Sequence, residues 1–284
     1  MARKIKLIIW IVIILLIFSF SQRSKDLVTP FAKPNLKQVV DNELRGEKGK
    51  YGIYIENLKT GETFAKNEHE SFEAGSLYKL WLLGAVFEKI KDGTLKEDEI
   101  LSGDIADLNT KFDIASDEAE LTEGEITLTV KDAIEQMITI SHNYSALLLT
   151  SKMGSSKIND FILKYGFNES SPGPPVKTTA SDMARFFEEL YAGRIIDKES
   201  SEKMLEILSR QQVRDRITKN LPGGVRVAHK TADIGFFEHD VGIVFTPKGD
   251  YVIVVLTETD SPEKTAQKIA EISKAVYEYF QSKL

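Results

Sequence analysis

Apolar and polar positions follow a strand-like pattern near both ends of the chain and a helical pattern in the middle. Residues 51–58 and 62–66 read as two strands joined by a hairpin turn at Lys59-Thr60-Gly61, and strand patterns return only late in the sequence. The later strands are predicted over 225–229, 241–246 and 251–257, and helices over 35–44, 130–140, 143–153, 157–165, 181–192, 198–208 and 262–284.

This order of elements predicts an α+β fold. An isolated two-stranded hairpin is marginal in water, so the first hairpin must pair with the strands at the far end of the chain. We therefore expect one antiparallel sheet of about five strands built from both chain ends and flanked by the terminal helices. An all-helical lobe, about residues 76–209, is inserted between the strands, and a cleft is expected where lobe and sheet meet.

The N-terminus has the features of a targeting segment. Residues 7–20 are apolar except for Ser19 and follow Arg3, Lys4 and Lys6. As a helix they span roughly 21 Å against a hydrocarbon core of about 30 Å, which is short for a membrane span and typical of a signal peptide. We assign 1–21 as a signal peptide or N-terminal membrane anchor, 22–34 as a linker and 35–284 as the main domain. Either alternative exports the body to the outer face of the cytoplasmic membrane, the periplasm or the cell exterior.

Composition narrows the classes of function. The net charge is −6, and because the first 25 residues hold five basic and no acidic residues, the remainder carries −11. An acidic body argues against nucleic acid as a partner. There are no cysteines, which excludes disulfides and thiolate catalysis. The four histidines show no metal-ligand spacing, so we expect no metal and no cofactor, and we expect a monomer.

A lysine stands at the start of a helix that is apolar on every side. No residue from Leu80 to Phe87 is charged, which predicts a buried helix. Lys79 follows Ser76 by three residues, so the two side chains share a face. A serine needs an activating base to act as a nucleophile, and a lysine can serve when burial lowers its pKa enough to make it neutral. The simpler alternative is that Lys79 extends its amine out of the first turn.

Two further motifs accompany this pair. Ser141-x-Asn143 lies between two apolar helices, where serine and asparagine commonly cap a helix. Lys230-Thr231 ends a predicted strand. Asn143 can hold a substrate amide and orient a neighbouring lysine, whereas Lys230 and Thr231 can bind a substrate carboxylate.

In this order the S-x-x-K, S-x-N and K-T-x motifs resemble the class A β-lactamase catalytic family and its penicillin-binding relatives. The resemblance covers about residues 35–284. It implies a β-lactamase/transpeptidase-like fold and acylation by a small-molecule β-lactam or a peptidoglycan stem peptide. The implied catalytic residues are Ser76, Lys79, Ser141 and Lys230, with Ser141 relaying a proton to the leaving nitrogen.

The resemblance also implies binding residues. The backbone N–H groups of Ser76 and Asp233 form the oxyanion hole, and Asn143, Thr231 and Arg216 bind substrate. Arg216 stands five residues before Leu221, as a carboxylate-binding arginine does in some members, and a surface arginine is the alternative reading.

The sequence departs from the family pattern at several positions. His142 replaces the usual aspartate, Ala232 replaces the usual glycine, and the carboxylate of Asp233 would face an anionic substrate. The family's Glu-x-x-Leu-Asn loop, whose glutamate activates the deacylating water, is missing from the short segment 166–179. Glu169 is the one acid in that segment, and a solvated loop residue is its simpler reading. We expect acylation to survive and hydrolysis of the acyl-enzyme to be slow.

Three functions are compatible with these motifs. The first is an exported serine hydrolase of β-lactamase type. The second is a D-alanyl-D-alanine carboxypeptidase or penicillin-binding protein that acts on peptidoglycan. The third is a non-catalytic wall-binding module, against which the complete set of motif residues argues.

Overall fold

A computed structural model describes residues 34–283 of the chain. The predicted segment 1–21, nearly all of the linker 22–34 and Leu284 lie outside the described residues. Within the described part, no helix is both long enough and apolar enough to cross a bilayer.

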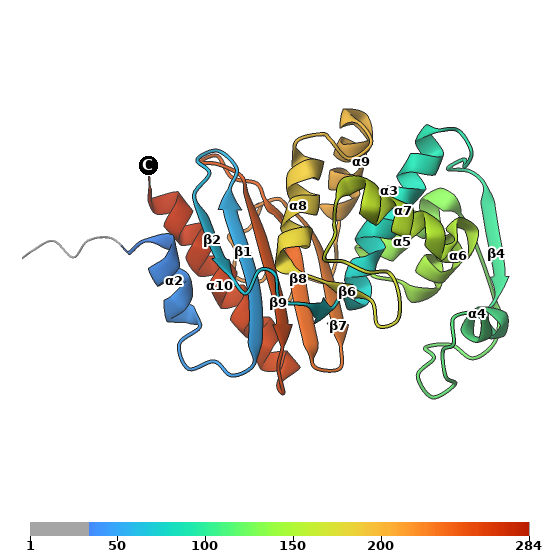
Figure 1. Cartoon of the computed structure of the whole chain (residues 1–284), viewed down its shortest axis with the longest axis horizontal. Coiled ribbons are helices and arrows are strands. Elements are labelled where there is room, and N and C mark those ends of the chain that lie inside the picture. The colour runs from blue at the N-terminus through green and yellow to red at the C-terminus, as the bar shows by residue number, and fades with distance from the viewer. Residues whose placement is uncertain (1–33, 284) are drawn as a thin grey trace, which may run out of the picture.

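The central sheet is built from both ends of the chain, as the sequence predicts. Its strands are antiparallel and lie in the order β2-β1-β9-β8-β7 (Figure 1). The first hairpin joins the late strands through the pairing of β1 with β9. The strands are β1 (Lys50–Asn57), β2 (Thr63–Lys66), β7 (Val227–Ile234), β8 (Phe237–Val244) and β9 (Tyr251–Glu258).

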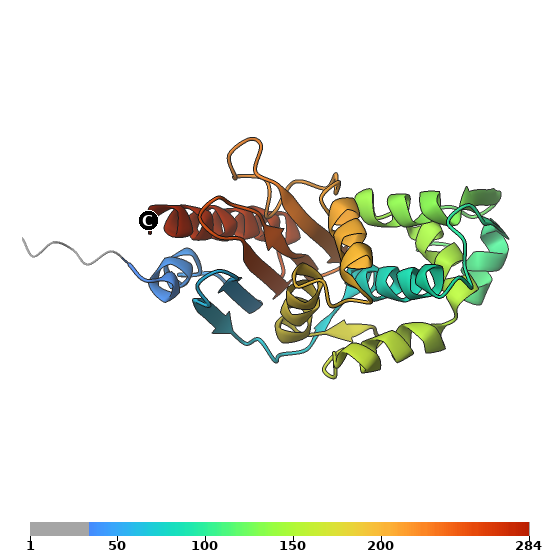
Figure 2. The same ribbon diagram turned by 90° about the horizontal axis from the view of Figure 1, so that it is seen from above.

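Helices cover both faces of this sheet. The terminal helices α2 (Leu36–Glu43) and α10 (Pro262–Ser282) pack together on one face, and α8 (Ala180–Tyr191) packs on the other (Figure 2). Along β9, Ile253 and Val255 join the core beneath α10, whereas Val252 and Val254 join the core on the opposite face. Alternate side chains of a strand point to opposite faces, so a strand covered on both faces is a continuous apolar run.

A mostly helical lobe stands beside the sheet (Figure 1). Its helices are α3 (Tyr78–Lys91), α4 (Ile105–Lys111), α5 (Val130–Thr139), α6 (Asn143–Met153), α7 (Ser155–Tyr165) and α9 (Lys198–Leu208).

The expectation that the lobe is entirely helical is wrong in two respects. It contains a two-stranded sheet of β4 (Ile100–Asp104) and β5 (Glu125–Thr129), and α8 packs on the central sheet although its residues fall inside the predicted lobe. A second small sheet pairs β3 (Phe72–Glu73) with β6 (Lys177–Thr178). The sequence of β4, Ile-Leu-Ser-Gly-Asp, has its two apolar side chains next to each other, so it lacks the apolar–polar alternation that would identify a strand.

The helix α3 is buried along most of its length, as its apolar sequence predicts. Residues 79 to 87 are all buried, which places the amine of Lys79 inside the protein and excludes its extension into solvent. At Gly84 the helix lies so close to α7 that an added Cβ would stand 2.1 Å from the Phe161 ring. This close approach fixes α3 against its neighbour in the lobe.

Replacing Gly84 with alanine should therefore destabilise the protein. Overpacking a core costs about 1–3 kcal/mol, and the better helix propensity of alanine returns at most about 1 kcal/mol. We expect a net loss of about 1–2 kcal/mol in urea unfolding. Gly223→Ala is the control, because nothing lies within 4 Å of the position of its added Cβ. Equal stability of the two variants would contradict this packing argument.

Candidate active site

The predicted nucleophile lies in a tight turn at the junction of lobe and sheet. Ser76 is the central residue of the 3₁₀ turn η1 (Gly75–Leu77), which leads directly into α3 and packs against β7. Gly75 has φ +47°, and a Cβ there would lie 3.1 Å from the Ile234 side chain and 3.4 Å from Ala232. The turn therefore needs glycine, and it brings Ser76 next to the strand segment that carries Asp233.

Lys79 lies one turn later and is enclosed by acceptors. Its Nζ donates to the carbonyl oxygen of Ser141 at 2.6 Å, to Oγ of Ser141 at 3.2 Å and to Oδ1 of Asn143 at 2.7 Å. Burial lowers the pKa of Lys79 to about 8, against the opposing effect of Glu120 and Asp233. These three contacts use all the hydrogens of an ammonium group. A neutral amine has one hydrogen fewer, so it gives up one of the three contacts and has a lone pair that can accept a proton.

The hydroxyl of Ser141 lies between two lysines. It accepts from Lys79 and, at 2.9 Å, from Nζ of Lys230, which also donates to the Thr231 carbonyl at 2.7 Å. Lys230 is fully buried, and burial together with the charge of Lys79 lowers its pKa well below the ordinary value. Ser141 has φ +58°, a left-handed conformation that costs a non-glycine residue about 1–2 kcal/mol. Such strain concentrates at functional sites.

The replacement of aspartate by His142 has a structural explanation. His142 is the N-cap of α6, and its Nδ1 accepts from the backbone N–H of Ser145 at 3.2 Å. Aspartate is a preferred residue at this position, and an imidazole nitrogen with a free lone pair can take its place. Burial lowers the pKa of His142, which favours that neutral form.

Asn143 is fixed from both sides by charged residues. Its Oδ1 accepts from Lys79, and its Nδ2 donates to Oε1 of Glu120 at 2.6 Å. Sequence reasoning missed Glu120, which lies in the connection between α4 and β5 and belongs to none of the motifs. Beside Asn143 is a hollow of ≈ 200 Å³, whose lining also includes Tyr78, Ile114, Glu118, Glu120, Tyr144 and Leu147.

Four predicted residues thus form one hydrogen-bonded cluster, namely Lys79, Ser141, Asn143 and Lys230. The Ser76 hydroxyl makes no hydrogen bond to this cluster among residues 34–283, although helical spacing places it on the Lys79 face. The same part of the chain contains no group of His, Asp and Glu residues arranged to hold a metal ion.

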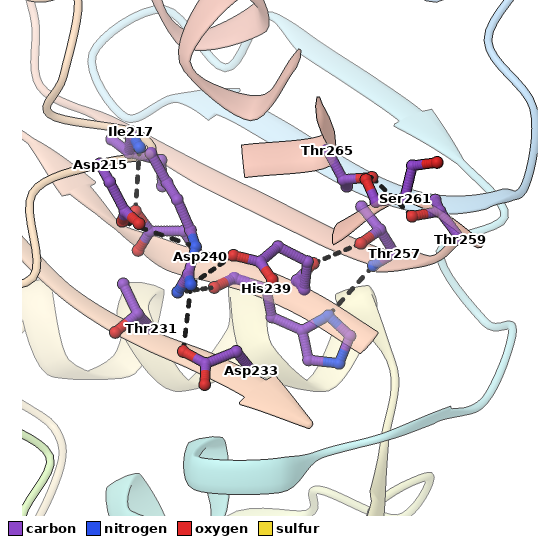
Figure 3. A network of polar contacts seen from close by, with 12 residues as sticks. Asp215, Ile217, Thr231, Asp233, His239, Asp240, Thr257, Thr259, Ser261 and Thr265 are labelled. Atoms are coloured by element: carbon purple, nitrogen blue, oxygen red, sulfur yellow. Dashed lines mark hydrogen bonds and ion pairs between the residues drawn. The ribbon is translucent and has the colours of Figure 1, made fainter. Parts of the chain in front are cut away.

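Arg216 contacts β7 through Asp233, near the end of the strand that also carries Thr231. Thr231 and Asp233 are two residues apart on that strand and share one face (Figure 3). The guanidinium of Arg216 is not free, because it contacts Asp233 and Glu238. The predicted contact of Arg216 with a substrate carboxylate therefore stays a prediction that requires a change of partner.

Glu169 contacts residues that are not members of the Lys79 cluster. Its carboxylate accepts from the Thr179 hydroxyl at 2.8 Å and contacts Nδ1 of His69 at 2.9 Å, and its backbone N–H donates to Asp182. Within the described residues it makes no hydrogen bond or ion pair to Ser76, Lys79 or Asn143. This placement agrees with a structural role at the start of α8.

Comparisons with known proteins agree with this fold. The model of the Beta-lactamase enzyme family matches residues 35–280, so the chain belongs to that family. The chain is similar to the beta-lactamase of Sphaerobacter thermophilus DSM 20745, with 28% identity, a TM-score of 0.77, and 88% of this chain and 99% of that chain covered. It is also similar to the structure of PBP-A, with 25% identity, a TM-score of 0.76, and 87% and 96% covered.

An ancestral (GNCA) class A beta-lactamase shares the fold at 22% identity, with a TM-score of 0.72 and 86% and 100% of the two chains covered. No curated protein matches the chain. The α+β, β-lactamase-like fold predicted from the sequence is therefore confirmed.

Proposed function

We propose that this protein is an exported serine hydrolase that β-lactams acylate at Ser76. In this proposal neutral Lys79 accepts the proton of the Ser76 hydroxyl as its oxygen attacks the β-lactam carbonyl. Ser141 then passes a proton to the leaving nitrogen, and the backbone N–H groups of Ser76 and Asp233 hold the oxyanion.

The observation that carries this proposal is the hydroxyl of Ser141 held between two buried lysines. Burial lowers the pKa of both amines, and for Lys79 the value of about 8 leaves roughly a tenth of the molecules neutral at pH 7. A buried amine that exchanges protons near neutral pH, next to a hydroxyl and one turn from Ser76, is what acyl transfer requires. A module that only binds has no need of this costly arrangement.

The direct test is the mass of the protein after incubation with a chromogenic cephalosporin. We expect the mass to rise by one drug-derived acyl group, located by peptide mapping on the peptide that contains Ser76. Ser76→Ala is the control and should stay unmodified. Modification that persists in Ser76→Ala, or that maps to another peptide, would exclude the assignment.

A D-alanyl-D-alanine peptidase is the second candidate, favoured by the position of Glu169. The carboxylate of Glu169 is bound by Thr179 and His69 and makes no hydrogen bond or ion pair with the Lys79 cluster within the described residues. Without a base for deacylation, β-lactams would inhibit the enzyme rather than serve as its substrates. A mutant of PBP-A is described as an acyl-enzyme complex with penicillin G. Release of D-alanine from a stem peptide would distinguish this function from β-lactam hydrolysis.

Export is part of the proposal and rests on the apolar segment 7–20 with its basic flank. An enzyme that acts on peptidoglycan or on incoming β-lactams works outside the cytoplasm. A reporter that is active only after export, fused behind Leu284, should be active. The matched control is the same fusion without residues 1–21, which should be inactive. Activity of both fusions would contradict export through this segment.

A further inference from the structure

The guanidinium of Arg216 is surrounded by acidic groups. Its side chain is only 3% exposed, its Nη2 donates to Oδ2 of Asp233 at 3.1 Å, and it forms an ion pair with Glu238. The carboxylate of Asp215 lies 3.7 Å from Nε, which has no hydrogen-bond partner among the described residues. One buried cation is thus shared by three carboxylates.

Asp233 differs from Glu238 in its exposure to solvent. The Glu238 side chain is 6% exposed, whereas that of Asp233 is 70% exposed. Asp233 follows Thr231 by two residues on β7, so both side chains lie on one face of the strand (Figure 3). The carboxylate of Asp233 is therefore presented to solvent beside Thr231 and bound to Arg216, where the proposed function would place a substrate carboxylate.

We propose that Asp233 is a built-in carboxylate that occupies Arg216 and selects against substrates carrying a free carboxylate on the leaving side. The preferred acyl donors then end, on that side, in an uncharged ester or amide. A substrate carboxylate would have to displace Asp233 from the guanidinium or bind beside it. Either route opposes binding, because two carboxylates repel each other and the cation is already paired. This inference rests on the proposed acylation of Ser76.

The test compares benzylpenicillin with its methyl ester, using the second-order rate constant for acylation of Ser76 measured by mass spectrometry. Asp233→Asn should raise the ratio of the benzylpenicillin rate to the ester rate about 10- to 100-fold, because only the acid gains a charged hydrogen-bond partner. The ratio cancels any effect of the substitution on the oxyanion hole, which acts on both substrates alike. Asp98→Asn, an equal change of charge at an exposed position between α3 and β4, should affect neither rate.

A non-covalent measurement separates this inference from the proposed function. Calorimetry with benzylpenicillin on Ser76→Ala and on Ser76→Ala/Asp233→Asn should show 10- to 100-fold tighter binding by the double variant, whether or not Ser76 reacts. Labelling of Ser76 with no effect of Asp233→Asn in either assay would overturn the inference and leave the proposed function intact. Failure of both compounds to label Ser76, together with tighter binding by the double variant, would overturn the proposed function alone.

Discussion

Replacing Lys79 with methionine should slow the acylation of Ser76 by about 10²–10⁴-fold, the usual contribution of a general base. Methionine fills a similar volume in the buried site and has no proton-accepting nitrogen. Lys79→Arg should lose as much, because a guanidinium stays protonated at all relevant pH values. The measurement is the second-order rate constant for formation of the acyl-enzyme, followed by rapid quenching and mass spectrometry. A Lys79→Met protein that reacts within tenfold of the wild-type rate would place the base elsewhere.

The pH dependence provides an independent check on Lys79. Burial lowers its pKa to about 8, so the neutral form increases as the pH rises through that value. Acylation should therefore accelerate from pH 6 through 8 and level off above about pH 9. Glu120 raises the pKa of Lys79, so Glu120→Gln should move the midpoint to lower pH. An acylation rate that does not change between pH 6 and 9 would mean that Lys79 is not the base that accepts the proton of Ser76.

Long, regular patterns of apolar residues predicted the helices and strands that form the core. The helix 143–153 and the helix 198–208 begin and end as predicted, because each follows a residue whose side chain caps it and each contains buried apolar residues. The strands β1 and β9 were found because burial on both faces leaves apolar runs bounded by turn residues. The ranges 225–229 and 241–246 cover β7 and β8 only in part, because polar residues such as Lys230 and Asp240 interrupt those strands. The strand β4 was missed because it is largely exposed and its sequence, Ile-Leu-Ser-Gly-Asp, does not alternate between apolar and polar residues.

The site residues could be predicted because they occur in short motifs with fixed spacings between residues. Ser76 and Lys79 are one helical turn apart, and Ser141 and Asn143 flank the start of one helix. The residues that form hydrogen bonds and ion pairs with these side chains are not related to them by any such spacing. Glu120 lies 23 residues from Asn143 in an irregular segment, and Arg216 meets Asp233 and Glu238 only after β7 and β8 have paired. Their roles depend on tertiary contacts that the sequence does not display.

Hydrolysis of the acyl-enzyme should be the slow step of any reaction with a β-lactam. Deacylation needs a base that directs a water at the ester, and the segment 166–179 offers only Glu169. That carboxylate is bound by Thr179 and His69, and it makes no hydrogen bond or ion pair to a member of the Lys79 cluster within the described residues. Loss of general-base assistance slows a step by about 10²–10⁴-fold, so the acyl-enzyme should accumulate.

The expected trace with a chromogenic cephalosporin is a burst equal to the enzyme present, followed by slow turnover. Glu169→Gln should leave both phases unchanged, because Glu169 has only structural contacts in the described part of the chain. Glu120→Gln is the matched control, since it removes an acid that does contact the cluster through Asn143. Loss of the slow phase in Glu169→Gln would show that this carboxylate reaches the ester. Rapid turnover without a burst, unchanged in Glu169→Gln, would mean that another base, such as Lys79 itself, carries out deacylation.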